Sequence, residues 1–265
     1  MNLKSLAVAA ALCISPSFAI IGLGVQYAPN FGTSLDKTNN GVIENLGSDN
    51  ANAGTIQYRH GSFSGMQGLG LKLWIDIIPI IDVEATYNLQ WGSYNSTLSV
   101  FDSDGKLTSE QPIELKFDGV PFGKATPKFV AMNGDLSITY PITSLPIIRP
   151  YIGGGITYYL STPVMSSSFV KKYFNTMESS AKEALLSGSM DDAEAEALAN
   201  KLSTQLQDEG LNTNIGGHII LGARFKLPVI PIAAYVNGKY YFAMDYDDEI
   251  DASPFVLEAG IGLAL

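Results

Sequence analysis

The stretch Ile81-Asp82-Val83-Glu84-Ala85-Thr86-Tyr87-Asn88-Leu89-Gln90-Trp91 decides the fold. Its odd-numbered residues are apolar and its even-numbered residues are polar. An alternation of period two is typical of a β-strand with one apolar and one polar face. Such a strand cannot lie in a core that is apolar on both sides.

Seven further segments alternate in the same way, with polar or small residues on one face. The eight segments cover residues 21–27, 68–76, 81–91, 130–140, 148–160, 219–226, 232–242 and 255–265. After the N-terminal segment described below, no stretch has the roughly 20 apolar residues that a membrane helix needs. If the chain spans a membrane, it must therefore do so as a closed barrel, because every backbone amide needs a partner there.

Residues 1–19 have the layout of a secretory signal peptide. Lys4 supplies the basic region, residues 6–14 are largely apolar, and small residues at Ser17 and Ala19 predict cleavage after Ala19. A lipoprotein anchored on Cys13 is the alternative, which the bulky Leu12 disfavours. Cleavage after Ala19 removes the only cysteine, so the remaining residues 20–265 have neither disulfides nor thiolate ligands.

The chain is acidic, with 16 basic and 26 acidic residues and a formal net charge of −10. Loss of Lys4 with the signal makes the rest of the chain more acidic. Nucleic acid is therefore disfavoured as a partner.

The connections between the segments alternate in length. Three are short and contain proline, at 77–80, 145–147 and 227–231, and four are long, at 28–67, 92–129, 161–215 and 243–254. Short turns on one rim and long loops on the other predict an eight-stranded antiparallel up-and-down barrel with its long loops outside the cell. Residues 55–60 and 94–117 are also β-prone and are expected to extend strands above the membrane. The alternative is that they add a ninth and a tenth spanning strand.

These features resemble the small bacterial outer-membrane barrels of OmpA, OmpX and OmpW type. The last eleven residues, 255–265, look like the C-terminal strand read by the barrel-assembly machinery, although the chain ends in Leu265 and not in an aromatic residue. The resemblance implies an all-β, porin-like membrane protein of a Gram-negative bacterium, located in the cell outer membrane. It also implies the assembly machinery and periplasmic chaperones as partners during biogenesis, and it brings no site residues.

Ten charged residues fall on the polar parity and are predicted to form a charge network in the lumen. They are Lys72, Asp76, Asp82, Glu84, Asp135, Arg149, Arg224, Lys226, Lys239 and Glu258. Turning the basic members toward lipid would cost about 2–4 kcal/mol each at midplane depth. We interpret the network as a structural filling of the barrel, with a conduction path as the alternative. A soluble β-sandwich is the other fold that one-sided strands allow.

Eight aromatic residues on the apolar parity are expected to form the girdles at the lipid interfaces. They are Tyr87, Trp91, Tyr140, Tyr158, Phe225, Tyr240, Phe242 and Phe255.

Residues 168–209, in the third long loop, have apolar residues at helical spacing and predict a helical hairpin. Ser189 and Asp192 resemble a capping box at the start of its second helix. We expect the two helices to pack on each other over the barrel mouth, with a partner-binding surface or a lid as the alternative. On this basis, residues 166–212 should be removable without loss of the barrel.

Catalytic motifs are sparse. Apart from the signal, the chain has two histidines, His60 in the first long loop and His218, expected near the outer rim beside a serine-bearing loop. It has no nucleophile elbow, metal-binding histidine pair or phosphate loop. The acidic residues Asp245, Asp247, Asp248, Glu249 and Asp251 could hold Ca²⁺ or meet lipopolysaccharide, but a solvated loop is the simpler interpretation.

The sequence therefore predicts an outer-membrane barrel without cofactors or metals, whose role is structural, adhesive or that of a minor solute path. Its expected partners are outer-membrane lipid and lipopolysaccharide, and the ligand of its extracellular loops is unknown. The alternative function is that of an outer-leaflet lipid-modifying enzyme.

Overall fold

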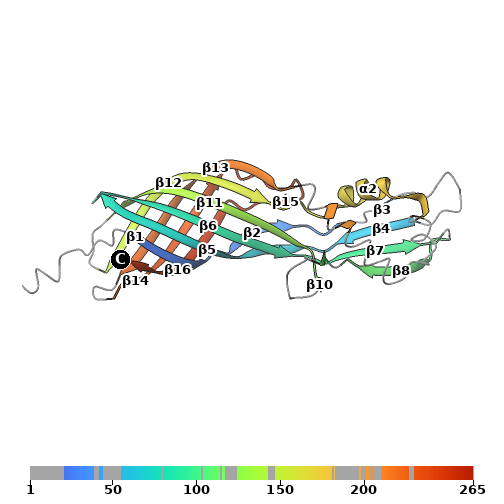
Figure 1. Cartoon of the computed structure of the whole chain (residues 1–265), viewed down its shortest axis with the longest axis horizontal. Coiled ribbons are helices and arrows are strands. Elements are labelled where there is room, and N and C mark those ends of the chain that lie inside the picture. Colours follow the sequence, from blue (N-terminus) through green and yellow to red (C-terminus); the bar gives the residue numbers. More distant parts are fainter. Residues whose placement is uncertain are drawn as a thin grey trace, which may run out of the picture.

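The computed structural model shows an elongated molecule with a barrel at one end and a smaller lobe at the other (Figure 1). The structure describes residues 21–38, 42–43, 55–78, 80–102, 104–113, 115–116, 124–142, 147–180, 182, 197, 201–202, 204–205, 210–226 and 230–264. The predicted signal peptide lies outside this part of the chain. No helix in the described ranges is long and apolar enough to cross a membrane.

Eight antiparallel strands form the barrel. They are β1 (Ile21–Tyr27), β5 (Phe63–Ile78), β6 (Ile81–Ser93), β11 (Lys128–Pro141), β12 (Ile148–Ser161), β13 (Asn212–Lys226), β14 (Ile232–Phe242) and β16 (Phe255–Ala264). Each strand pairs with its neighbour along the chain, and β1 pairs with both β5 and β16. The sheet is therefore closed and has no free edge.

The eight predicted segments are the eight strands of the barrel, and the predicted fold class is confirmed. In β6, each even-numbered residue is buried and each odd-numbered residue is partly or fully exposed. The apolar parity faces outward all round the barrel, with Leu23, Ile156 and Leu221 each at least 60% exposed. Exposing this much apolar surface to water would be unfavourable, whereas the hydrocarbon of a lipid layer solvates it.

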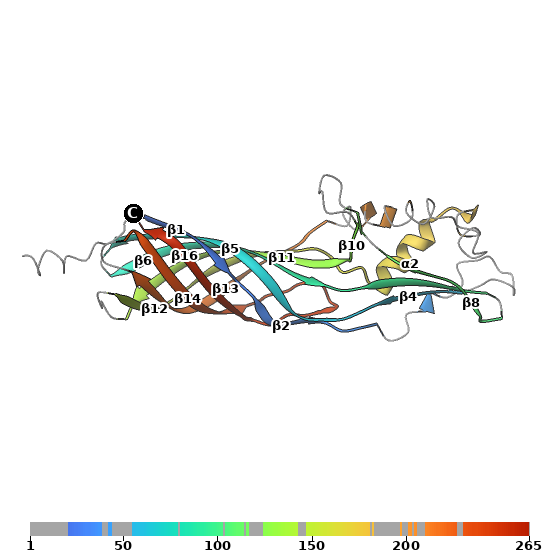
Figure 2. The same cartoon turned by 90° about the horizontal axis from the view of Figure 1, so that it is seen from below.

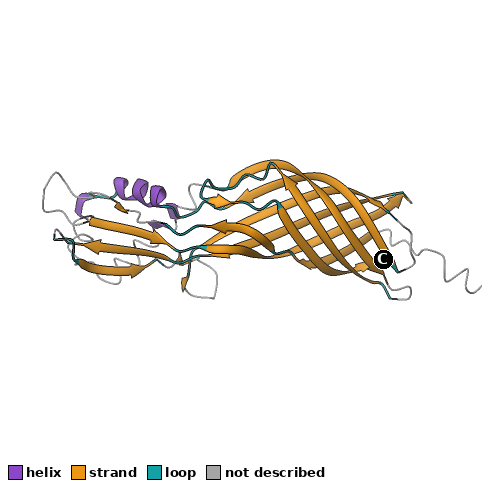
Figure 3. Ribbon diagram, turned by 180° about the vertical axis from the view of Figure 1, so that it is seen from behind, coloured by secondary structure: helices purple, strands orange, loops and turns teal. Residues whose placement is uncertain are grey.

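Several strands are longer than predicted and continue out of the barrel (Figure 3). Strand β5 begins at Phe63, five residues before the predicted segment, and β13 begins at Asn212. The short strands β2 (Asn30–Leu35) and β15 (Ile250–Asp251) pair with each other, and β2 also pairs with β5 above the barrel.

The lobe contains a separate four-stranded sheet of order β3-β4-β7-β8. Its strands are β3 (Val42–Ile43), β4 (Thr55–His60), β7 (Ser96–Phe101) and β8 (Leu107–Pro112), with a small β9 (Leu115–Lys116) and β10 (Lys124–Ala125) pair apart from it. The β-prone segments 55–60 and 94–117 thus extend the molecule and add no spanning strand.

Helix α2 (Ser167–Thr176) lies along the lobe (Figure 2). Ser166 caps it, because its hydroxyl accepts a hydrogen bond from the amide of Phe169 at 3.1 Å. The helix ends where Met177 takes an extended conformation, well before Gly188. The predicted capping box of the second helix lies outside the described residues.

Helix α2 packs on the lobe sheet, which the expectation of two helices over the barrel mouth did not include. Its buried residues, Val170 and Phe174 among them, join Ile56, Tyr58 and Val100 of the lobe sheet in one hydrophobic cluster. Leu202, from the second expected helix, lies in the same hydrophobic cluster, and most of that second helix lies outside the described residues. The sheet has an apolar face that needs cover, and α2 supplies it. Removing residues 166–212 would therefore uncover the core of the lobe, so the expected tolerance applies to the barrel alone.

The outward facing of the apolar parity can be tested at Leu221, which lies midway along the exposed face of β13. Leu221→Arg should cost about 2–4 kcal/mol of folding free energy in lipid vesicles, because it places a cation in hydrocarbon. Leu107→Arg, at an exposed leucine of β8 in the lobe, is the matched control and should change stability by less than about 0.5 kcal/mol. Urea unfolding followed by heat-modifiable gel mobility measures both. Equal effects of the two variants would contradict the assignment of β13 to the membrane.

Candidate functional site

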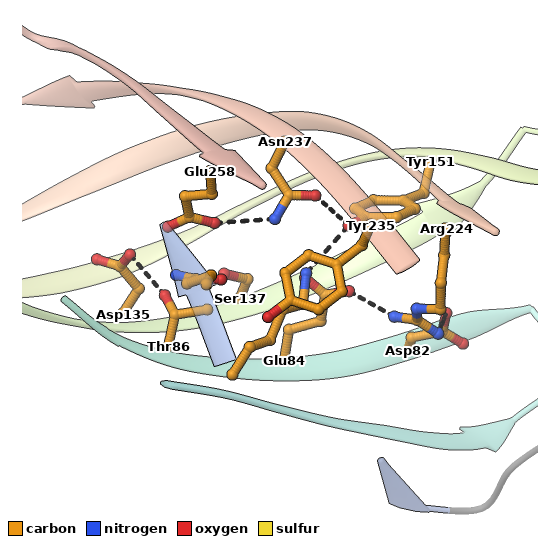
Figure 4. Close-up of polar contacts among 12 residues, drawn as sticks. Asp82, Glu84, Thr86, Asp135, Ser137, Tyr151, Arg224, Tyr235, Asn237 and Glu258 are labelled. Atoms are coloured by element: carbon orange, nitrogen blue, oxygen red, sulfur yellow. Dashed lines mark hydrogen bonds and ion pairs between the residues drawn. The ribbon is translucent and has the colours of Figure 1, made fainter. Parts of the chain in front are cut away.

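The lumen is filled by side chains from the inward parity of the barrel strands. Lys239, on β14, lies 2.6 Å from Asp135 Oδ2 and 2.8 Å from Glu258 Oε1. Asn88 and Asn237 donate to the two oxygens of Glu258 at 2.9 and 2.8 Å. Figure 4 shows Asn237 and Glu258 side by side, on the neighbouring strands β14 and β16. Every carboxylate oxygen of Glu258 thus has a partner, as a buried charge requires.

A second group of charges lies nearer the short turns. Glu84 Oε2 forms an ion pair with Lys72 Nζ at 2.7 Å, and Glu84 Oε1 accepts a hydrogen bond from Arg224 at 2.6 Å. Arg224 also contacts Asp76 at 3.1 Å, and Arg149 contacts Asp82 at 3.0 Å. The opposite charges are interleaved within the lumen, so each one offsets part of the desolvation cost of its neighbour.

Nine of the predicted lumen charges lie in contact with an opposite charge in the structure. They are Lys72, Asp76, Asp82, Glu84, Asp135, Arg149, Arg224, Lys239 and Glu258. Lys226 lies at the end of β13 and is half-buried.

Aromatic side chains occupy the rest of the lumen, a role that the sequence pattern did not predict for them. Trp74, Tyr151 and Tyr235 are at most 2% exposed. The guanidinium of Arg224 lies 4.9 Å from the Trp74 ring, and Lys72 Nζ lies 4.8 Å from the Tyr235 ring. Both distances are typical of cation–π contacts. The signal was present in the sequence, because these rings share the inward parity with the charges.

Inward glycines make room for these rings. A Cβ atom added at Gly22 would lie 2.0 Å from the indole of Trp74. At Gly260 the added atom would lie 2.5 Å from the ring of Tyr235. The small residues therefore determine where the large ones fit, which leaves the lumen packed.

An apolar cluster closes the mouth of the barrel beneath the lobe. Phe63 and Phe129 stack with ring centroids 6.2 Å apart, and Tyr246 meets Phe129 edge-on at 5.5 Å. Leu35 of β2 and Ile250 of β15 belong to the same cluster. Charged groups fill the lower lumen and apolar groups fill its outer end.

The predicted interface aromatics lie on the outside of the barrel. Seven are exposed to between 39% and 52%, namely Tyr87, Tyr140, Tyr158, Phe225, Tyr240, Phe242 and Phe255. Trp91 is half-buried. Two more outward aromatics, Tyr27 and Phe31, lie at the outer end of β1 and on β2, where the sequence reasoning assigned no girdle residue.

His218 does not lie at a rim beside a serine-bearing loop, as expected, but inside the lumen. Its Nε2 is 2.8 Å from Ser137 Oγ, its Nδ1 is 2.8 Å from Thr157 Oγ1, and Asp135 Oδ1 is 4.0 Å from Nδ1. Residues of the types used in nucleophilic catalysis are thus brought together by β11, β12 and β13. Ser137 is 1% exposed and His218 is 2% exposed, so both lie beneath the surface that a lipid or a solute meets.

His60 links the lobe to the barrel mouth. Its Nε2 lies 3.3 Å from Glu249 Oε2, and its Nδ1 lies 3.0 Å from the carbonyl of Gly61. Burial alone would lower the pKa of His60, but the hydrogen bond and charge of Glu249, with the Gly61 carbonyl, raise it above its ordinary value. With acceptors at both ring nitrogens, the imidazolium form fits this position.

A cleft of about 430 Å³ lies where the lobe meets the barrel mouth. Its lining includes Asp247, Asp248 and Glu249 and the start of α2, with Ser166 and Lys172. Asp247 is held in place by the amides of Val164 and Glu249, at 3.0 and 3.1 Å. In the described part of the chain, no group of three or more metal-ligating side chains is placed to hold a metal ion.

No protein-family model matches the chain, and no curated protein matches it. Among solved structures, it is similar to the outer membrane protein OprG of Pseudomonas aeruginosa, with 12% identity and a TM-score of 0.39 over 92% of this chain and 94% of that one. The outer membrane protease OmpT of Escherichia coli has 9% identity and a TM-score of 0.35 over 96% of this chain and 100% of that one. The NanC porin has 11% identity and a TM-score of 0.26 over 92% of this chain and 100% of that one. No residue role follows from similarity at this level.

The assignment to the membrane rests on the chain itself. The sheet is closed, its outer face is a continuous apolar band with aromatic residues, and its charges point inward. The protein is an integral outer-membrane β-barrel.

Removing one charge from the lumen tests whether the network is a single balanced unit. Lys239→Met should cost about 3–5 kcal/mol, because it leaves Asp135 and Glu258 buried without their shared cation. Lys128→Met, at the exposed outer end of β11, removes the same charge from the surface and is the control. Urea unfolding of the refolded proteins in vesicles measures the difference. A cost for Lys239→Met as small as that of the control would mean that the two carboxylates are not charged in the folded barrel.

The contact between His60 and Glu249 predicts a pH dependence in the mouth region. Because the folded pKa of His60 is raised, the pair stabilises the folded state fully below the ordinary value of about 6.5. This stabilisation is lost as the pH rises through the raised value. Protease cleavage of the lobe should therefore become faster above this range in the wild type, and Glu249→Gln should abolish the transition. A transition that persists unchanged in Glu249→Gln would assign it to another group.

Proposed function

We propose that this protein is a non-conducting membrane anchor that presents its lobe outside the cell for adhesion or recognition. The observation that carries the proposal is the filled lumen. Lys72, Lys239 and Glu258 are 0% exposed, and the apolar mouth cluster lies above them. An eight-stranded barrel has an interior just wide enough for side chains. Because side chains occupy this interior, we infer that it does not serve as a solute path.

The construction of the lobe supports a role at the surface. The connections between the barrel strands carry the chain beyond the barrel, where β4, β7 and α2 share their own hydrophobic core. A tethered, independently packed module on a rigid support is typical of binding structures. The cleft between α2 and the acidic loop lies on this side of the molecule and offers a concave site.

We do not propose an enzymatic role. The Ser137 and His218 contact is the observation that favours the alternative, an outer-leaflet lipid-modifying enzyme, because the distance of 2.8 Å is that of a nucleophile and its base. Against it, both side chains are enclosed among the lumen charges, and an ester would have to displace that network to reach Ser137 Oγ.

We infer that residues 1–19 are a signal peptide of a Gram-negative bacterium and that the chain belongs with the small barrels of OmpA, OmpX and OmpW type. Its partners would then be outer-membrane lipid, lipopolysaccharide and the assembly machinery with its chaperones. The eight strands, the short turns on one rim and the exposed apolar band support this inference.

Planar-bilayer recording of the refolded full chain tests the filled lumen. We expect no conductance steps under conditions in which a porin, reconstituted in parallel, conducts. Phe174→Asp disrupts the core of the lobe. This variant should also show no conductance steps, and its heat-modifiable gel mobility should be that of the wild type. Stable conductance steps from the wild type would favour a solute path over an anchor.

Adhesion of intact cells tests the lobe. Cells expressing the wild type should be retained on a glycan array or on immobilised fibrous proteins more than cells expressing Phe174→Asp at equal surface level. Lys171→Asp, at an exposed position of α2 that lies outside the core, is the matched control and should keep the lobe folded. Equal retention of the wild type and Phe174→Asp would count against the adhesive role and leave the barrel assignment intact.

A further inference from the structure

One face of the barrel has a groove that its own side chains leave open. Gly134 lies on the outward parity of β11, between Met132 and Leu136. A Cβ atom added at Gly134 would meet no other atom within 4 Å. The other outward glycines of the described barrel strands, at 154, 217 and 238, each have an atom within 3.5 Å of such a Cβ. Gly134 is therefore a notch in the apolar band.

The strand register explains the direction of the groove. Gly134 pairs with Tyr158, and Tyr158 pairs with Ile215, so these residues form one row across β11, β12 and β13. In the next row, Leu136 pairs with Ile156, and Ile156 pairs with Gly217. Each row lacks a side chain at one end. A depression of about 280 Å³, lined by Leu136, Ile156, Tyr158 and Ile215, lies between them.

The residues around the groove show that it faces the hydrocarbon of the membrane. Its walls are among the most exposed apolar side chains of the barrel, with Ile156 at 63% and Ile215 at 69%. They belong to the band that faces hydrocarbon, and Tyr87 and Tyr158 of the interfacial aromatics flank Gly134 on either side. Tyr87 Oη donates to Met132 Sδ at 3.0 Å, which holds its ring beside the notch.

We propose that this groove binds one acyl chain of a membrane lipid. A void along the wall of a barrel forfeits dispersion contacts, and a flexible methylene chain recovers them by lying between the two rows. No water is released when apolar surface meets a lipid chain, so shape alone provides the selectivity. Tyr158, at the edge of the groove, has a hydroxyl for a lipid ester or headgroup, as aromatic residues of the girdles do.

Filling the groove tests the proposal without damaging the barrel. The wild type, refolded in vesicles containing phosphatidylcholine with a chain spin label, should give a motionally restricted component in the electron paramagnetic resonance spectrum. Gly134→Leu should reduce this component, because its side chain occupies open space. Gly238→Leu adds the same side chain on the outer face of β14 and should leave the component unchanged.

A second pair of variants protects the test against misfolding of Gly134→Leu, which heat-modifiable mobility would detect. Ile215→Trp closes the groove from its opposite wall, whereas Ile219→Trp changes an exposed residue of the same strand beyond it. Only the first should reduce the restricted component. Equal spectra of the wild type and either groove-filling variant would overturn the proposal. It would also be overturned if the wild type were a dimer that Gly134→Leu dissociates while the restricted component stays the same, because the occupant would then be a second copy of this chain.

Discussion

Every backbone amide in the hydrocarbon layer needs a hydrogen-bond partner. Strand β1 closes the barrel by supplying these partners to the two strands on either side of it. It pairs with β5 on one side and β16 on the other, so the first and last strands of the barrel meet. Without that closure, two rows of unpaired donors and acceptors would face lipid. Closure in turn assigns each side chain to lipid or to the lumen, because successive residues of a strand alternate between the two.

The lumen is a consequence of this alternation. Eight strands enclose a space that side chains fill, and the residues pointing into it here are charged, amide-bearing or aromatic. A charge in such a space is tolerated only with partners, which Lys239 finds in Asp135 and Glu258, and Arg224 finds in Asp76 and Glu84. The same packing buries His218 and Ser137, which are 2% and 1% exposed. This filled lumen is the reason why we propose a supporting role for the barrel and not that of a pore.

Outside the membrane, the lobe buries its apolar side chains in a core, as a water-soluble domain does. Ile56, Tyr58 and Val100 point to one side of the lobe sheet, and α2 covers them with Val170 and Phe174. Apolar residues in this part of the molecule are buried, whereas in the barrel they are exposed. The contrast between the two ends shows that the barrel faces hydrocarbon and the lobe faces water.

The sequence by itself determined the eight barrel strands, their up-and-down order and the facing of residues such as Val83 and Glu84. A period of two is local, and the length of each connection limits which strands are neighbours. The same reasoning placed Lys239 and Glu258 in the lumen, because a charge on the lipid face costs too much. Tertiary structure alone decided the partners of each charge, the packing of α2 on the lobe sheet and the meeting of Ser137 with His218. These contacts join residues up to 170 positions apart, as in the Asn88 and Glu258 hydrogen bond. They depend on barrel stagger and on side-chain direction, which no local periodicity records.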